Sequence, residues 1–135
     1  MTWDMKWYDA DHTILLFTIQ KNSTWEDFHL AMNNYVSELA ATSKTIHVII
    51  YDEFGLPPGN PMPHFRTQMQ KTEHYRNTGL IVTVSPHSSM GFLQSVVDLT
   101  SRFMRIGPQK GVFVKSIDEA VERIHKEQAR VNQSV

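Results

Sequence analysis

Short runs of β-branched and other apolar residues alternate along this chain with longer segments in which apolar residues recur every three or four positions. The short runs are typical of buried strands and the longer segments of amphipathic helices. Four strand–helix pairs follow one another: residues 13–19 and 25–39, 45–51 and 62–74, 80–84 and 89–104, and 112–114 and 117–129. Because alternating strands and helices form crossover units, this order predicts an α/β fold with parallel strands and helices over the sheet.

The beginning of the chain has a different pattern. Trp3, Met5 and Trp7 alternate with polar or amphipathic neighbours, which is the period of a half-exposed strand, and polar turn residues follow at 9–12. Segment 14–19 is apolar on both faces, as in a strand that is covered on both sides. We therefore predict a mixed sheet in which an antiparallel edge strand precedes parallel βα units, covered by about four helices.

Two of the predicted helices are preceded by residues at the spacing of a capping box. Ser23 and Glu26 have this spacing before the first helix, and Ser116 and Glu119 have it before the last. After Arg130 the chain is polar, and we expect it to fray. The first helix carries one apolar stripe: Trp25, Phe28, Met32, Tyr35 or Val36, and Leu39.

The two remaining helices differ in their apolar surface. The helix around 64–74 has only Phe65, Met69 and Thr72 as an inner stripe, so we expect it to be exposed. The helix over 89–104 has an apolar arc wider than one sheet contact requires. Deep burial and contact with a second subunit would each explain this arc, and we predict a homodimer.

Composition restricts the class of protein. The 135 residues suit one domain, and a formal net charge of -1 provides no field that would attract nucleic acid. No apolar run approaches the roughly 20 residues that a membrane span needs, so we expect a cytoplasmic protein. The chain has no cysteine, which excludes disulfides, thiolate metal sites and cysteine nucleophiles.

The residues that could carry chemistry lack a diagnostic spacing. Metal sites on one helix or strand show close histidine pairs, whereas the seven histidines here are each ten or more residues apart. The alternatives are a metal site assembled only in three dimensions and a mixture of surface and core histidines; we expect the mixture, with His47 as the best core candidate, and neither a metal nor a cofactor. His87, Ser88 and Ser89 are adjacent in sequence, but neighbouring residues rarely adopt triad geometry, and helix capping explains the serines. We therefore predict a protein that is not an enzyme.

Position still indicates a candidate site. Ligands of open parallel sheets bind beyond the carboxyl ends of the strands, where this chain has a glycine- and proline-rich loop at 52–63 and the segment 85–89. The helix after residue 88 would offer free N–H groups at this edge. We predict that a ligand or partner binds Asp52, Phe54, Gly55, Ser85, His87, Ser88 and Ser89.

Several local strings resemble the STAS-like family, the anti-sigma-factor-antagonist type of domain that SpoIIAA-like proteins typify. They are Trp7-Tyr8 with Thr13-Ile14-Leu15, the helix opening at 24–28, the strand at 46–52, segment 77–84 and the closing segment 113–120. The resemblance covers nearly the whole chain. It implies a mixed sheet with helices and a signalling protein that acts by binding a protein partner, in some relatives under the control of a phosphorylated serine.

The chain departs from that family at the phosphorylation site. Asp52 matches the acidic residue at the strand end, but residues 53–57 contain no hydroxyl where relatives carry the serine. We therefore expect a non-enzymatic protein-binding module without the phosphoserine switch. The alternative is a small-ligand or lipid-binding protein, or a small enzyme, with a pocket under the loop at 52–63.

Overall fold

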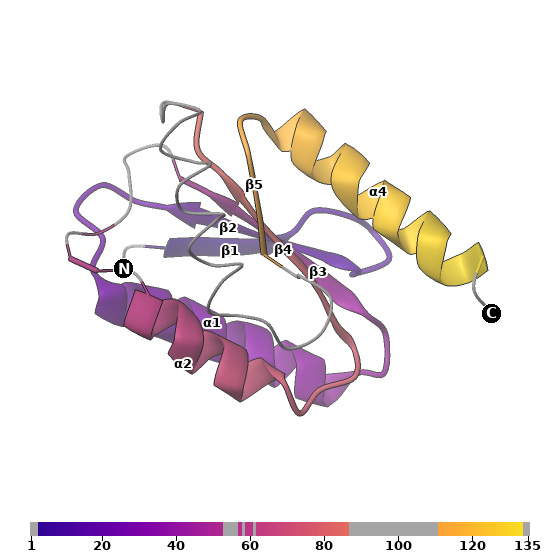
Figure 1. Ribbon diagram of the computed structural model, residues 1–135, viewed down its shortest axis with the longest axis horizontal. Helices are drawn as coiled ribbons and strands as arrows, with labels where there is room; N and C mark the ends of the chain where they lie inside the picture. The colour runs from indigo at the N-terminus through magenta and orange to yellow at the C-terminus, as the bar shows by residue number, and fades with distance from the viewer. Residues whose placement is uncertain (1–2, 53–56, 58, 61, 87–110, 134–135) are drawn as a thin grey trace.

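The computed structural model describes residues 3–52, 57, 59, 60, 62–86 and 111–133. This part of the chain contains five strands and three helices (Figure 1). The elements are β1 (Trp3–Trp7), β2 (Ile14–Ile19), α1 (Trp25–Ala41), β3 (Ile46–Tyr51), α2 (Met62–Thr72), β4 (Thr78–Val84), β5 (Gly111–Val114) and α4 (Ile117–Gln133).

The strands form one sheet in the order β1-β2-β3-β4-β5. β1 runs antiparallel to β2, with Met5 opposite Phe17, and every later strand is parallel to the one before it. The predicted α/β class and the mixed sheet with an antiparallel edge strand are therefore confirmed.

Helices cover both faces of the sheet. α1 and α2 pack side by side on one face and α4 packs on the opposite face (Figure 1). The side chains of β2 divide accordingly, because successive residues of a strand point to opposite faces. Phe17 belongs to the core beneath α1, whereas Ile14 packs with Ala120 and Ile124 of α4. The prediction that this strand is covered on both sides is confirmed.

The start of α1 differs from the predicted cap. Thr24, rather than Ser23, is the N-cap residue, and it forms a capping box with Asp27: the Thr24 hydroxyl accepts from the Asp27 N–H and the Asp27 carboxylate accepts from the Thr24 N–H. Ser23 instead donates from its Oγ to the Gln20 carbonyl at 2.7 Å. The predicted box was one residue too early, because serine and threonine are both good caps and spacing alone does not choose between them.

The other predicted helix features have mixed outcomes. Ser116 caps α4 as predicted, since its Oγ accepts from the Glu119 N–H at 3.1 Å. The helix continues to Gln133, however, so the chain does not leave the helix at Arg130 as predicted, and residues 134–135 of the predicted tail lie outside the described residues. An ion pair between Glu127 and Arg130, one turn apart, contributes to this last part of the helix.

α2 buries one residue more than its sequence indicates. Thr72, predicted on the inner stripe, is buried, and so is Gln68, which gave no apolar signal, while the other described residues of the helix are exposed or half-buried. The Thr72 hydroxyl satisfies its hydrogen bond locally, by donating to the Gln68 carbonyl at 3.1 Å. The predicted helix over 89–104, and with it the surface on which the predicted homodimer depends, lies outside the described residues.

β4 contains a β-bulge where it pairs with β3, and two side chains accept hydrogen bonds from the backbone of this bulge. Between the pairs Ile46–Thr78 and Val48–Ile81, β4 contains one residue more than β3. The Gly79 N–H donates to the Tyr35 hydroxyl at 3.3 Å, and the Leu80 N–H donates to His47 Nδ1 at 3.0 Å. The predicted core histidine is thus confirmed, and its imidazole replaces a carbonyl in the sheet.

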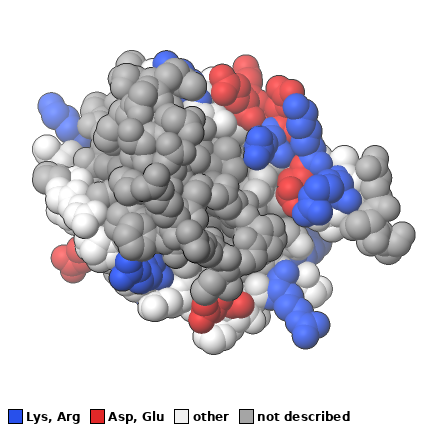
Figure 2. Space-filling view, in the orientation of Figure 1, with Lys and Arg blue, Asp and Glu red and all other residues white. Residues whose placement is uncertain are grey.

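The surface charge is mixed. Figure 2 shows basic and acidic side chains side by side over the region of α4, where Glu122 pairs with Lys126 at 3.2 Å. None of the helices in the described part of the chain has the length and apolar character that a bilayer crossing requires.

Candidate functional site

Two of the predicted site residues meet at the carboxyl edge of the sheet. Asp52 follows β3 and Ser85 follows β4, and their backbone N–H groups continue the ladder by donating to Val84 (2.8 Å) and Val114 (3.0 Å). The Ser85 Oγ lies 3.5 Å from Asp52 Oδ2. Both residues are buried, with exposed fractions of 3% and 4%. Because both side chains are buried, neither is exposed at the surface on which a large partner would bind.

The remaining predicted site residues cannot be placed in the same way. Phe54, Gly55, His87, Ser88 and Ser89 lie outside the described residues. Asp52 and Ser85 are therefore the two predicted residues that the structure brings together.

A second group of side chains lies at the starts of α1 and α2. Because these helices follow β2 and β3, which are adjacent and parallel, their first turns lie at the same edge of the sheet. His29 and His64, 35 positions apart in sequence, face each other with 2.8 Å between Nε2 of His29 and Nδ1 of His64. Their ring centroids are 5.0 Å apart and the ring planes are inclined to each other by 49°. We call these two residues the histidine pair.

Aromatic side chains hold both imidazoles in place. Trp25 stacks on His64, with 4.4 Å between ring centroids and 3° between ring planes. Trp25 also contacts Phe28 and Phe65 edge-on, and Phe28 contacts the ring of His29 at 5.3 Å. The histidine pair is therefore positioned by packing rather than by one hydrogen bond alone.

The protonation of the histidine pair follows from its surroundings. In a hydrogen bond between two imidazoles one nitrogen donates and the other accepts, so at least one ring is neutral. Partial burial lowers the pKa of His29, and His64 and the ammonium of Lys71 lower it further. The lowered pKa favours the neutral form of His29, in which one ring nitrogen carries a lone pair.

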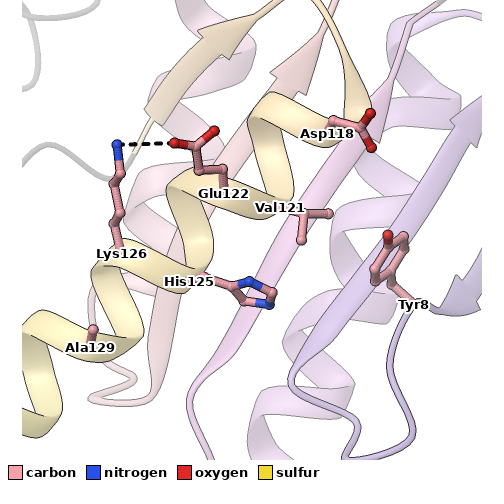
Figure 3. A pocket seen from close by; sticks show the side chains of 7 residues that line it. All are labelled: Tyr8, Asp118, Val121, Glu122, His125, Lys126 and Ala129. Carbon is pink, nitrogen blue, oxygen red and sulfur yellow. Dashed lines mark ion pairs between the residues drawn. The ribbon is translucent and has the colours of Figure 1, made fainter.

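A third feature is an open groove between α4 and the β1–β2 hairpin. It measures about 450 Å³ and is lined by Tyr8, Asp118, Val121, Glu122, His125, Lys126 and Ala129. In Figure 3 the ring of Tyr8 stands across the groove from Val121 and His125. The Tyr8 N–H donates to the Ile14 carbonyl at 2.8 Å, which fixes the base of this side chain, yet 45% of the residue is exposed.

Comparison with known proteins gives no relative: no protein-family model, no curated protein and no solved structure matches the chain. The chemistry of the three features therefore has to be inferred from their own geometry.

The sequence analysis missed the histidine pair and the groove. Neither histidine has a partner at helical or strand spacing, and Tyr8 and Val121 lie at opposite ends of the chain. One usable signal was topological: residues 25–29 and 62–65 each open a helix that follows one of two neighbouring parallel strands, and such helix starts meet at one edge.

Proposed function

We propose that the protein is a non-enzymatic protein-binding module and that the groove beside α4 receives a segment of the partner. The observation that carries this proposal is that the groove is shallow and widely open to solvent. Pockets for small molecules bury about 70–90% of the surface of their ligand. A groove of this form covers one face of a bound group only, so it suits a side chain presented by another protein.

The lining indicates the chemistry of that segment. Tyr8, Val121 and Ala129 provide apolar contact area, and tyrosine combines a large apolar ring with a polar hydroxyl, as residues of interface cores often do. Asp118 and Glu122 lie toward the beginning of α4, and Glu122 is already paired with Lys126. We expect a partner segment that inserts an apolar side chain between Tyr8 and Val121 and places a basic residue near Asp118.

The STAS-like resemblance is part of the same proposal. It is supported by the mixed sheet, in which one antiparallel strand precedes a parallel set. Residues 53–57 contain no hydroxyl beside Asp52, so partner binding is not switched by phosphorylation at that position. Binding would then depend on the amount of the partner or on another signal.

Site-specific crosslinking in the native host tests this proposal. A photo-reactive phenylalanine analogue replaces Tyr8 in one strain and Leu30 in another, because both residues are exposed but Leu30 is on α1. We expect a discrete protein adduct from position 8 that is absent from position 30. Mass spectrometry then identifies the partner, and its binding to the purified protein is measured directly.

Two matched substitutions separate the groove from general surface effects. Ala129→Arg fills the groove, whereas Ala40→Arg makes the same change at an exposed position of α1. The partner should lose at least about tenfold in affinity for Ala129→Arg and bind Ala40→Arg normally, since an interface core residue commonly contributes more than about 1 kcal/mol. Equal binding of both variants would contradict the proposal.

A second candidate function, a small-ligand site or enzyme pocket under the loop at 52–63, is favoured by one observation. The carboxyl group of Asp52 is buried at the carboxyl edge of the sheet, and ligands of such sheets bind at this edge. Native mass spectrometry of protein purified from its host tests it. A small molecule retained by the wild type and lost in Asp52→Asn would favour this candidate over the protein-binding module.

A further inference from the structure

Two imidazole nitrogens on neighbouring helices lie within hydrogen-bond distance, and aromatic side chains hold both rings in place. His29 is on α1 and His64 is on α2, and the 2.8 Å between Nε2 and Nδ1 is shorter than the 3.0 Å contact between Lys71 Nζ of α2 and Asn33 Oδ1 of α1. Imidazole is a preferred ligand of zinc, copper and nickel, and two positioned rings lower the entropic cost of binding an ion.

We propose that the histidine pair binds a divalent transition-metal ion of the zinc and copper class, through Nε2 of His29 and Nδ1 of His64. The ion takes the place of the proton that the two nitrogens share. In the neutral pair that proton moves to the outer nitrogen of its own ring, so both inner nitrogens present lone pairs and no net proton is released. A singly protonated pair loses one proton to solvent when the ion binds.

The geometry requires only a small movement. Zinc–nitrogen bonds of about 2.0–2.1 Å at a tetrahedral angle put two ligand nitrogens about 3.3 Å apart. The observed separation is 2.8 Å, so the nitrogens must move apart by roughly half an ångström and both lone pairs must turn toward the ion. Small changes in the side-chain torsions of two half-buried histidines are sufficient for this movement.

The surroundings define the kind of site. Among the described residues there is no group of three or more histidine, aspartate or glutamate side chains that could hold a metal, so the histidine pair supplies two protein ligands to the proposed site. Such an open site is weaker than a four-ligand structural site and leaves positions for another ligand. Lys71, whose Nζ donates to Asn33 Oδ1 at 3.0 Å, lowers the pKa of His29 and also repels a cation.

The experiment is titration of the full-length protein with Zn²⁺ and Cu²⁺, followed by calorimetry and tryptophan fluorescence. The wild type should bind one ion, and His29→Gln and His64→Gln should each weaken binding at least about tenfold. Cu²⁺ should quench Trp25, which stacks on His64, so Trp25→Phe should remove most of the quenching. Lys71→Gln should strengthen binding, because it removes the ammonium that repels a cation.

The chain provides a matched control. His12 stacks on Trp7, with 4.5 Å between centroids and 4° between planes, without a second histidine facing it in the described part of the structure. His12→Gln should leave the affinity and the quenching unchanged. An equal loss in His12→Gln, or wild-type binding weaker than about 1 mM, would show adventitious binding to surface histidines and overturn the proposal. If a glutamine variant fails to fold, NMR of the wild type still decides, since Zn²⁺ must shift the imidazole signals of His29 and His64 first.

Discussion

Gly79→Ala should destabilise the protein strongly, because the bulge in β4 has no room for a side chain at this position. A Cβ on Gly79 would lie 2.5 Å from His47 Nδ1 and 2.8 Å from the Ile46 carbonyl oxygen, well inside van der Waals contact. If the imidazole turns away, the buried Leu80 N–H loses its acceptor, at a cost of about 1–3 kcal/mol. The contact with the Ile46 carbonyl oxygen remains when the imidazole turns away, and moving the strands apart to relieve it costs a further 1–3 kcal/mol or so.

We therefore expect the free energy of unfolding to fall by about 2–5 kcal/mol, a large part of the roughly 5–15 kcal/mol of a typical domain. Urea denaturation followed by circular dichroism measures it. In a His47→Ala background the same change should cost about 1–2 kcal/mol less, because the contact with the ring is gone while the contact with Ile46 remains. Gly59→Ala provides the contrast: its new Cβ comes no closer than 3.8 Å to a neighbour but its φ is positive, so it measures backbone strain, which does not arise at Gly79. A loss below about 1 kcal/mol, or no dependence on His47, would refute this account of the bulge.

Three further predictions concern α1. Phe28→Ala should cost about 3–5 kcal/mol, because this buried ring packs between the aromatic residues at the carboxyl edge; a denaturation experiment showing less than about 1 kcal/mol would contradict it. Thr24→Ala should cost about 0.5–2 kcal/mol while Ser23→Ala costs clearly less, since only Thr24 caps the helix; equal costs in thermal unfolding would argue against the observed cap. Stability should also fall as pH rises above about 10, because burial raises the pKa of Tyr35 above its ordinary value of 10.0 and the unfolded chain releases that proton first. Tyr35→Phe should flatten this alkaline slope, and an unchanged slope would contradict the assignment.

Most of the fold could be predicted from the local patterns of apolar and polar residues in the sequence. The apolar run of β2 reflects burial on both faces of the strand. The three- and four-residue spacing of apolar residues in α1 reflects burial on one face of the helix. The end of α4 was harder to predict, because the ion pair of Glu127 with Arg130 stabilises a turn that looks like a polar tail. Gln68 was missed for a related reason: its burial is imposed by the packing of α2, and nothing in its polarity indicates that position.

The bulge illustrates a different limit of sequence reasoning. The sequence shows that His47 interrupts an apolar strand, and this was enough to predict burial. It does not show that the ring accepts a hydrogen bond from the neighbouring strand, because that role exists only once β4 contains an extra residue. The same event explains why glycine stands at position 79, opposite the ring.

The candidate sites depend on contacts between elements, which spacing rules do not register. A rule that looks for two histidines three or four residues apart finds ligands carried by a single helix, and it passes over His29 and His64 because they are on different helices. The order of strands was nevertheless sufficient to bring the first turns of α1 and α2 to one edge of the sheet. What it could not supply was the orientation of the rings, which Trp25 and Phe28 determine by packing against them. The order of the strands therefore predicts at which edge of the sheet the site lies, and the aromatic neighbours of the histidines determine which ring nitrogens face each other there.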